Sequence, residues 1–253
     1  ARPGDRYRIR LQVSGRWRQV TWARLERDGL FDLLRCEEAC WSSWDPTEPQ
    51  KRAYDIVLYG ATGFTGRLAA QYLWALKRGS GEAAVRELRV ALAGRSREKL
   101  QELMDEHGMD FDLVIADSGD KTALQTLATS TNVCISAAGP FWYHSRDLAY
   151  ACVLSGTDYT DINGESPYVD YLIRRFDQGA ESTGSFVVPN CGFDCVPSDL
   201  GCLAAVDLLQ KVSREAGQAD APVTCNCYMD IKGFVSGGTV ASGIYMAENP
   251  ALA

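Results

Sequence analysis

The chain has 253 residues, of which 46% are hydrophobic and 23% are charged, and its formal net charge is −7. These proportions are typical of a globular protein with a buried core, and they exclude a disordered or low-complexity chain. The acidic balance argues against a nucleic-acid partner, which would need a basic surface. No apolar run reaches the roughly 18 residues that a membrane-spanning helix requires.

The first 52 residues differ in charge from the rest of the chain. Residues 1–52 carry 11 basic and 8 acidic residues, so they are net positive in an acidic protein. Apolar residues alternate over 6–25 around Ser14-Gly15, which predicts a β-hairpin with a two-residue turn. Prolines in 41–52 predict a linker. We therefore expect residues 1–52 to be an N-terminal extension with its linker, or the end of a preceding domain.

From residue 54 onward, short β-rich runs alternate with amphipathic helical patterns. The expected strands are residues 55–59, 88–93, 113–116, 133–137, 159–162 and 185–189. Such alternation predicts βαβ units and an α/β fold, a Rossmann-type doubly wound parallel sheet, which we place at residues 53–198. A further helix, a strand over 223–231 and a helix beginning near Gly237 predict a partial second domain at 199–253, which looks truncated.

A glycine-rich loop lies between the first of these strands and its helix. The loop reads Gly60-Ala61-Thr62-Gly63-Phe64-Thr65-Gly66. Gly60 suits the tight turn that leaves the strand, Gly63 allows close approach of a pyrophosphate, and Gly66 allows the helix to pack on the sheet. Amide groups at the start of a helix favour an anion. The loop predicts a dinucleotide site, and the alternative is a plain turn.

The end of the second strand selects between the two nicotinamide cofactors. An NAD site typically has an acid there for the ribose 2′-hydroxyl, but this segment reads Ala93-Gly94-Arg95-Ser96. Arg95 offers a planar guanidinium for a 2′-phosphate, and Ser96 can donate to the same phosphate or cap the next helix. Small residues after the fourth strand, Ala138 and Gly139, leave room for the nicotinamide-side ribose. The cofactor predicted is NADP.

The catalytic residues are not defined by the sequence. Tyr143 and His144 follow the fourth strand, at the edge where such sheets bind ligands, and histidine is a common general acid or base. Asp194 follows the sixth strand and can orient a substrate or cap a helix. Other polar or reactive residues at strand ends are Asn163, Glu165, Asn190 and Cys191. A scaffold that binds a nucleotide without turnover is therefore one alternative.

Tyr228 and Lys232 form a Y-x-x-x-K motif and give a second alternative, a short-chain dehydrogenase. That chemistry needs both side chains on one face of a helix, whereas the surrounding alternation favours a strand. Metal binding is not expected, because the nine cysteines form no CxxC pair and the chain has two histidines. Reduced thiols predict an intracellular compartment, the cytoplasm first, with a lipid droplet or mitochondrion as alternatives.

Several ordered blocks resemble one known family. The blocks are YDIVLYGATGFTGRL, AGRS, NVCISAAGPFWYHS, GTDYTDINGES and NCGFDCVPSDLG. Together they resemble the saccharopine dehydrogenase-like oxidoreductases, whose relatives include trans-acting enoyl reductases, over residues 53–245. The resemblance implies a Rossmann domain followed by a second α+β domain with a large antiparallel sheet. The NADP-binding positions of the family correspond to Gly60, Thr62, Gly63, Phe64, Gly66, Arg95 and Ser96.

The same resemblance sets the functional expectation. It implies an NADP-dependent oxidoreductase that carries out NADPH-linked reduction of a small or lipid-like substrate. Peripheral association with a membrane or lipid droplet, and a homodimer, are further expectations.

Overall fold

The chain forms two compact units in a computed structural model. The six-stranded unit comprises Pro46–Gly192 with Val235–Ala253, and the three-stranded unit comprises Ala1–Asp45 with Phe193–Phe234. The domain limits expected at residues 52 and 198 stay a prediction. The residues that the structure describes are 8–13, 16–21, 52–79, 82–215, 224–229, 232–233 and 235–249.

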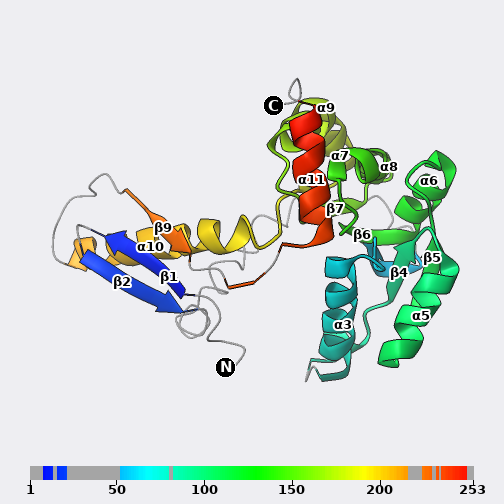
Figure 1. Cartoon of the computed structure of the whole chain (residues 1–253), viewed down its shortest axis with the longest axis horizontal. Helices are drawn as coiled ribbons and strands as arrows, with labels where there is room; N and C mark the ends of the chain where they lie inside the picture. Colours follow the sequence, from blue (N-terminus) through cyan, green and yellow to red (C-terminus); the bar gives the residue numbers. More distant parts are fainter. Residues whose placement is uncertain are drawn as a thin grey trace. The chain divides into compact units, whose positions relative to one another are not determined.

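A parallel sheet is the centre of the six-stranded unit (Figure 1). Its strands are β3 Tyr54–Tyr59, β4 Val90–Gly94, β5 Asp112–Ile115, β6 Thr131–Ser136, β7 Asp158–Asp161 and β8 Val187–Val188. They lie in the order β5-β4-β3-β6-β7-β8, and every neighbouring pair is parallel. The chain thus starts in the middle, adds two strands on one side and three on the other, as in doubly wound dinucleotide-binding folds. The predicted Rossmann-type sheet is confirmed.

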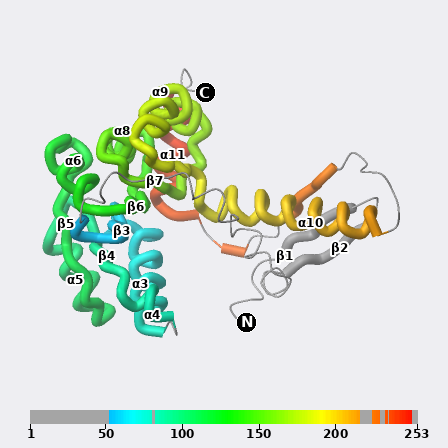
Figure 2. The backbone as a smooth tube through the Cα atoms, turned by 180° about the vertical axis from the view of Figure 1, so that it is seen from behind, coloured from blue at the N-terminus to red at the C-terminus, as the bar shows by residue number. Residues whose placement is uncertain are grey.

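Helices connect most of these strands, and one more follows later in the chain. They are α3 Phe64–Gly79, α4 Ala83–Arg86, α5 Arg97–His107, α6 Lys121–Ser130, α7 Phe141–His144, α8 Arg146–Leu154, α9 Ser166–Thr183 and, later in the chain, α11 Gly237–Glu248. Figures 1 and 2 show the unit from opposite sides. Among all the described residues, no helix is long and apolar enough to cross a membrane.

The sheet has an apolar layer on each face, because successive strand residues point to opposite sides. Leu58 of β3 packs with buried residues of α3 and α5. Its neighbours Val57 and Tyr59 pack instead with buried residues of α6, α8 and α9. All three side chains are at most 4% exposed. Burial on both faces explains why the strands read as apolar runs in the sequence.

The last strand of the sheet is shorter than predicted. β8 covers two residues, Val187–Val188, whereas the sequence predicted 185–189. It lies at the edge of the sheet and pairs with β7 alone, at Tyr159 and Thr160. Pro189 follows it and has no amide hydrogen to extend the pairing.

The three-stranded unit is described over β1 Arg8–Val13, β2 Arg16–Thr21, α10 Val196–Glu215 and β9 Cys227–Met229. Its strands lie in the order β2-β1-β9, with both pairs antiparallel. Ser14 and Gly15 lie outside the described residues, so the hairpin turn stays a prediction. The predicted linker lies outside them as well, except for Arg52.

Tyr228 belongs to a strand and not to a helix. It lies in β9 and pairs with Arg10 of β1. β9 ends at Met229, so Lys232 is not part of it. The short-chain dehydrogenase alternative, which needs Tyr228 and Lys232 on one helical face, is therefore wrong.

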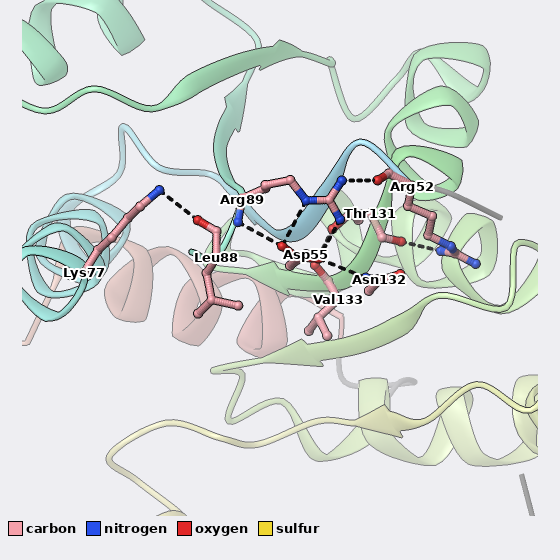
Figure 3. A network of polar contacts seen from close by, with 8 residues as sticks. All are labelled: Arg52, Asp55, Lys77, Leu88, Arg89, Thr131, Asn132 and Val133. Carbon is pink, nitrogen blue, oxygen red and sulfur yellow. Dashed lines mark hydrogen bonds and ion pairs between the residues drawn. The ribbon is translucent and has the colours of Figure 1, made fainter. Parts of the chain in front are cut away.

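Charged side chains connect the amino ends of the central strands (Figure 3). The Arg89 guanidinium, just before β4, donates to both carboxylate oxygens of Asp55 in β3, at 2.7 and 3.1 Å. Asn132 of β6 donates to the same carboxylate at 3.3 Å. Hydrogen bonds from Arg89 lower the pKa of Asp55 below its usual value, and burial opposes them. One carboxylate thus links the starts of three adjacent strands.

Arg52 makes a second set of contacts at this edge. Its guanidinium donates to the carbonyl oxygens of Ser155 at 2.7 Å and Gly156 at 3.0 Å, just after α8. It also donates to the carbonyl oxygen of Thr131, the first residue of β6, as Figure 3 shows, and to the Thr157 hydroxyl. The segment before β3 is thereby attached to α8 and β6.

We predict that Asp55→Asn lowers the free energy of unfolding by about 1 kcal/mol at pH 7. The effect is small because both side chains are partly exposed, 27% for Asp55 and 48% for Arg89. The folded chain lowers the pKa of Asp55. Its contribution is therefore complete above the unfolded-chain pKa of about 3.9 and disappears as the pH falls through the lower folded-state value.

Urea unfolding at pH 7 and pH 3 measures this difference. Asp110→Asn, at an exposed position, is the matched control and should change stability little at either pH. A loss in Asp55→Asn that is as large at pH 3 as at pH 7 contradicts the electrostatic explanation.

Candidate functional site

The glycine loop begins where β3 comes close to the segment after β6. Gly60 has a φ of +79°, a backbone conformation that side chains disfavour. A Cβ atom at Gly60 would lie 2.8 Å from the amide nitrogen of Ala138. The amide of Gly60 donates to the carbonyl oxygen of Ala93, the penultimate residue of β4, at 2.9 Å. Glycine at this position therefore allows the ends of three strands to meet.

The other two glycines of the loop, Gly66 and Gly63, differ in whether the surrounding atoms leave room for a side chain. A Cβ atom at Gly66 would overlap the Gly60 carbonyl oxygen and lie 2.9 Å from the Cα atom of Ala61. Close packing of α3 on the loop thus requires Gly66. At Gly63 the nearest atoms would be the carbonyl oxygens of Gly60 at 3.4 Å and Ala137 at 4.0 Å, which are ordinary contacts. The packing of the described chain therefore does not require glycine at position 63.

Thr62 and Phe64 lie in the same loop and at the start of α3. Thr62 is partly buried, whereas Phe64 is 68% exposed although it is a large apolar residue. The loop thus presents backbone and side chains outward at the carboxyl edge of the sheet.

Arg95 follows β4 and is exposed. It makes no ion pair with any residue that the structure describes. Its guanidinium lies close enough to Tyr59 to act on the pKa of that phenol, which burial first and then Asp117 raise to about 12, while Arg95 opposes them. An exposed cation is therefore present near the end of β3, beside the glycine loop.

Ser96 caps α5. Its hydroxyl oxygen accepts a hydrogen bond from the Lys99 amide at 3.3 Å, and the hydroxyl donates to Glu98 at 2.8 Å. The hydroxyl must turn away from Glu98 in order to donate to a phosphate. The sequence analysis missed this contact of Glu98, and the Ser-x-Glu spacing at a helix start is the signal that could have indicated it.

The segment after β6 is fixed by buried polar groups. The hydroxyls of Ser136 and Ser145 lie 2.7 Å apart, and Ser145 donates to the carbonyl oxygen of Ala138 at 3.1 Å. The Ala137 amide donates to the Tyr59 carbonyl oxygen at 2.9 Å. Gly139 and Pro140 complete the segment and are joined by a cis peptide bond. Ala138 and Gly139 therefore lie in a constrained loop next to the glycine loop.

Two of the three candidate catalytic residues, Tyr143 and His144, are neighbours in α7, and their ring centroids lie 6.3 Å apart. His144 lies at the end of α7, and its Nδ1 atom is 2.9 Å from the Ser118 hydroxyl in the segment after β5. Tyr143 is 66% exposed, and its ring centroid is 4.9 Å from that of Tyr245 in α11. Asp194 is exposed and belongs to the three-stranded unit. The sequence analysis did not find Ser118 or Tyr245, because long-range contacts leave no local pattern.

Asp161, at the end of β7, is the centre of a buried polar network. It accepts hydrogen bonds from the Tyr159 hydroxyl at 2.9 Å, from the amides of Asn163 and Asn190 at 3.1 Å, and from the Asn163 side chain. Burial raises the pKa of Asp161, and these hydrogen bonds oppose it. Asp161 therefore connects the segments that follow β7 and β8.

The sheet order, the glycine loop after the central strand and the exposed arginine after β4 define a dinucleotide-binding domain of the Rossmann class. The chain belongs to the saccharopine dehydrogenase NADP-binding domain family, which it matches over residues 56–188, more than half of its length. NADP as cofactor and an NADP-binding oxidoreductase domain are thereby confirmed at the level of the family.

Several curated relatives are mycobacterial proteins. A Mycobacterium tuberculosis protein with a provisional name as a trans-acting enoyl reductase is 39% identical over 195 residues, which are 76% of this chain and 43% of that protein. A trans-acting enoyl reductase of Mycobacterium bovis is 36% identical over 201 residues, 77% of this chain and 44% of that protein. The chain therefore spans less than half the length of these curated relatives.

Among solved structures, apo saccharopine dehydrogenase (L-Glu forming) from Saccharomyces cerevisiae is similar with a TM-score of 0.49 and 20% identity. The similarity covers 62% of this chain and 32% of that one.

We predict that Gly66→Ala lowers the free energy of unfolding by about 3 kcal/mol, because its methyl group overlaps main-chain atoms that cannot move aside. The matched control is Gly63→Ala in the same loop, where a Cβ atom makes only ordinary contacts. It should change stability by less than about 1 kcal/mol. Urea unfolding of both variants measures the difference, and equal losses would show that the loop does not pack as described.

Proposed function

We propose that the six-stranded unit binds NADPH at the carboxyl edge of its sheet. The diphosphate would lie against the amides of residues 60–66, and the Arg95 guanidinium would bind the 2′-phosphate. The observation that carries this proposal is the contrast at the loop: Gly60 and Gly66 are required by packing, whereas a Cβ atom at Gly63 would make only ordinary contacts. A glycine that the protein's own packing does not require is explained by close approach of a ligand.

The order of the strands determines the orientation in which the cofactor would lie across the loop. β4 and β6 flank β3 on opposite sides, so Arg95 and Ala138 lie on opposite sides of the glycine loop. A dinucleotide across this loop would place its adenosine end towards Arg95 and its nicotinamide end towards Ala138 and Gly139. Ser96 would contribute to the 2′-phosphate site after its hydroxyl leaves Glu98.

We further propose that the reaction is reduction of an enoyl group in a lipid-like substrate, which the names of the mycobacterial relatives support. When bound, NADPH supplies a hydride to one carbon of the double bond. The other carbon needs a proton, and our candidate donor is His144. Its Nδ1 atom faces Ser118, and its Nε2 atom makes no hydrogen bond to a described residue.

We predict that Arg95→Ala weakens NADPH binding by roughly 10- to 100-fold, the usual size of a lost charge-assisted hydrogen bond, and changes NADH binding by less than about threefold. Isothermal titration calorimetry with both cofactors measures this. Arg175→Ala, an exposed arginine on α9, is the matched control and should bind both cofactors as the wild type does. Equal losses of NADPH and NADH in Arg95→Ala would contradict the assignment of the 2′-phosphate site.

A turnover assay separates the enzyme from a scaffold that binds the nucleotide alone. We expect the chain to oxidise NADPH in the presence of an enoyl thioester, and His144→Gln to lower the rate at least about tenfold, as loss of general acid catalysis does. The readout is NADPH absorbance. Binding of NADPH without oxidation across enoyl, carbonyl and imine substrates would favour the scaffold.

A further inference from the structure

Glu165 is a buried carboxylate that joins three segments of the six-stranded unit. It lies between β7 and α9 and is 3% exposed. Its Oε1 atom accepts hydrogen bonds from the Phe141 amide at 2.9 Å and from the Ser242 hydroxyl at 2.7 Å. Its Oε2 atom accepts from the Trp142 amide at 3.0 Å. Both oxygens are acceptors, an arrangement that an ionised carboxylate satisfies.

These amides define what the carboxylate holds in place. Phe141 and Trp142 follow Gly139-Pro140 directly, so Glu165 fixes the far end of the segment that begins at Ala137. The near end is fixed by the hydrogen bond from the Ala137 amide to Tyr59. The path of Ala138 and Gly139 is thus set from both ends, and Glu165 supplies the contacts at one of them.

The same carboxylate attaches α11 to this segment. Ser242 lies in α11, and its hydroxyl would be 3.6 Å from a Cβ atom placed on Gly139. One turn further on, the Tyr245 ring packs against Tyr143. α11 therefore covers the segment after β6, although it lies nearly 100 residues later in the chain.

We propose that Glu165 is a positioning residue for the nicotinamide half of NADPH, an inference that rests on the proposed function. Glu165 acts through the main chain of the segment containing Ala138 and Gly139, and Ser242 supports it from α11. The adenosine half lies on the other side of β3, at Arg95, where Glu165 makes no contact. Loss of the Glu165 hydrogen bonds should therefore affect the two halves of the cofactor unequally.

The test uses Glu165→Gln and two ligands, NADPH and 2′,5′-ADP, which carries the adenosine half without nicotinamide. In the variant, an NH2 group replaces one carboxylate oxygen. This group cannot accept a hydrogen bond from a main-chain amide. We expect NADPH to bind about tenfold more weakly, the lower end for a hydrogen bond to a charged group, and 2′,5′-ADP to bind within about twofold of the wild type. Calorimetry on the 253-residue chain measures both affinities.

Two further variants complete the test. Glu181→Gln, the same substitution at an exposed position of α9, should bind both ligands as the wild type does. Ser242→Ala removes one of the three hydrogen bonds and should weaken NADPH alone, by about threefold. If Glu165→Gln does not fold, Ser242→Ala decides the question.

The outcomes are distinguishable. Unchanged NADPH affinity in a folded variant, or equal weakening of both ligands, overturns the role of Glu165 and leaves the proposed function standing. Failure of the wild type to bind either ligand overturns the proposed function, and the inference falls with it.

Discussion

The close approach of two main-chain segments at Gly60 is the constraint on which the site depends. The amide of residue 138 lies where a side chain on residue 60 would have to be, so the loops after β3 and β6 lie together only when residue 60 is glycine. Gly66 then brings α3 against the same turn. Everything proposed for the cofactor assumes this geometry, since it sets the separation between the amides of the loop and the segment that follows β6.

The two edges of the sheet use charge differently. At the amino edge, Asp55 and Arg89 satisfy each other, and their pairing connects strands. At the carboxyl edge, Arg95 is exposed and makes no ion pair within the described part of the chain. Paired charges contribute to structure, whereas a cation without a partner beside a glycine loop is suited to an anionic ligand. Glu165 is also charged and lies at the carboxyl edge. Unlike Arg95, it is satisfied within the protein, by main-chain amides and a hydroxyl.

Local patterns predicted the sheet and the loop well. Runs such as residues 56–59 are apolar because the strands are buried on both faces, and the spacing of Gly60, Gly63 and Gly66 reports directly on turn and packing geometry. The two-residue length of β8 was not predictable, because it depends on how many residues of β7, its single neighbour, are available for pairing. The contacts of Glu165 with Ser242 and of His144 with Ser118 were missed, since each joins residues far apart in the sequence. The cofactor type followed from Arg95, whereas a catalytic group requires a bound substrate to define it.

Arg52 has a consequence for any recombinant or chimeric form of this fold. Its guanidinium donates hydrogen bonds to the carbonyl groups that follow α8 and to the first carbonyl of β6. Carbonyl groups at a helix end that lose their donor are costly when they are shielded from water. A fragment that starts at residue 53, where the apolar pattern of the first strand would suggest cutting, removes this cation. A fragment that starts one residue earlier keeps Arg52. A transplantable unit should therefore start at Arg52 and not at the first residue of β3.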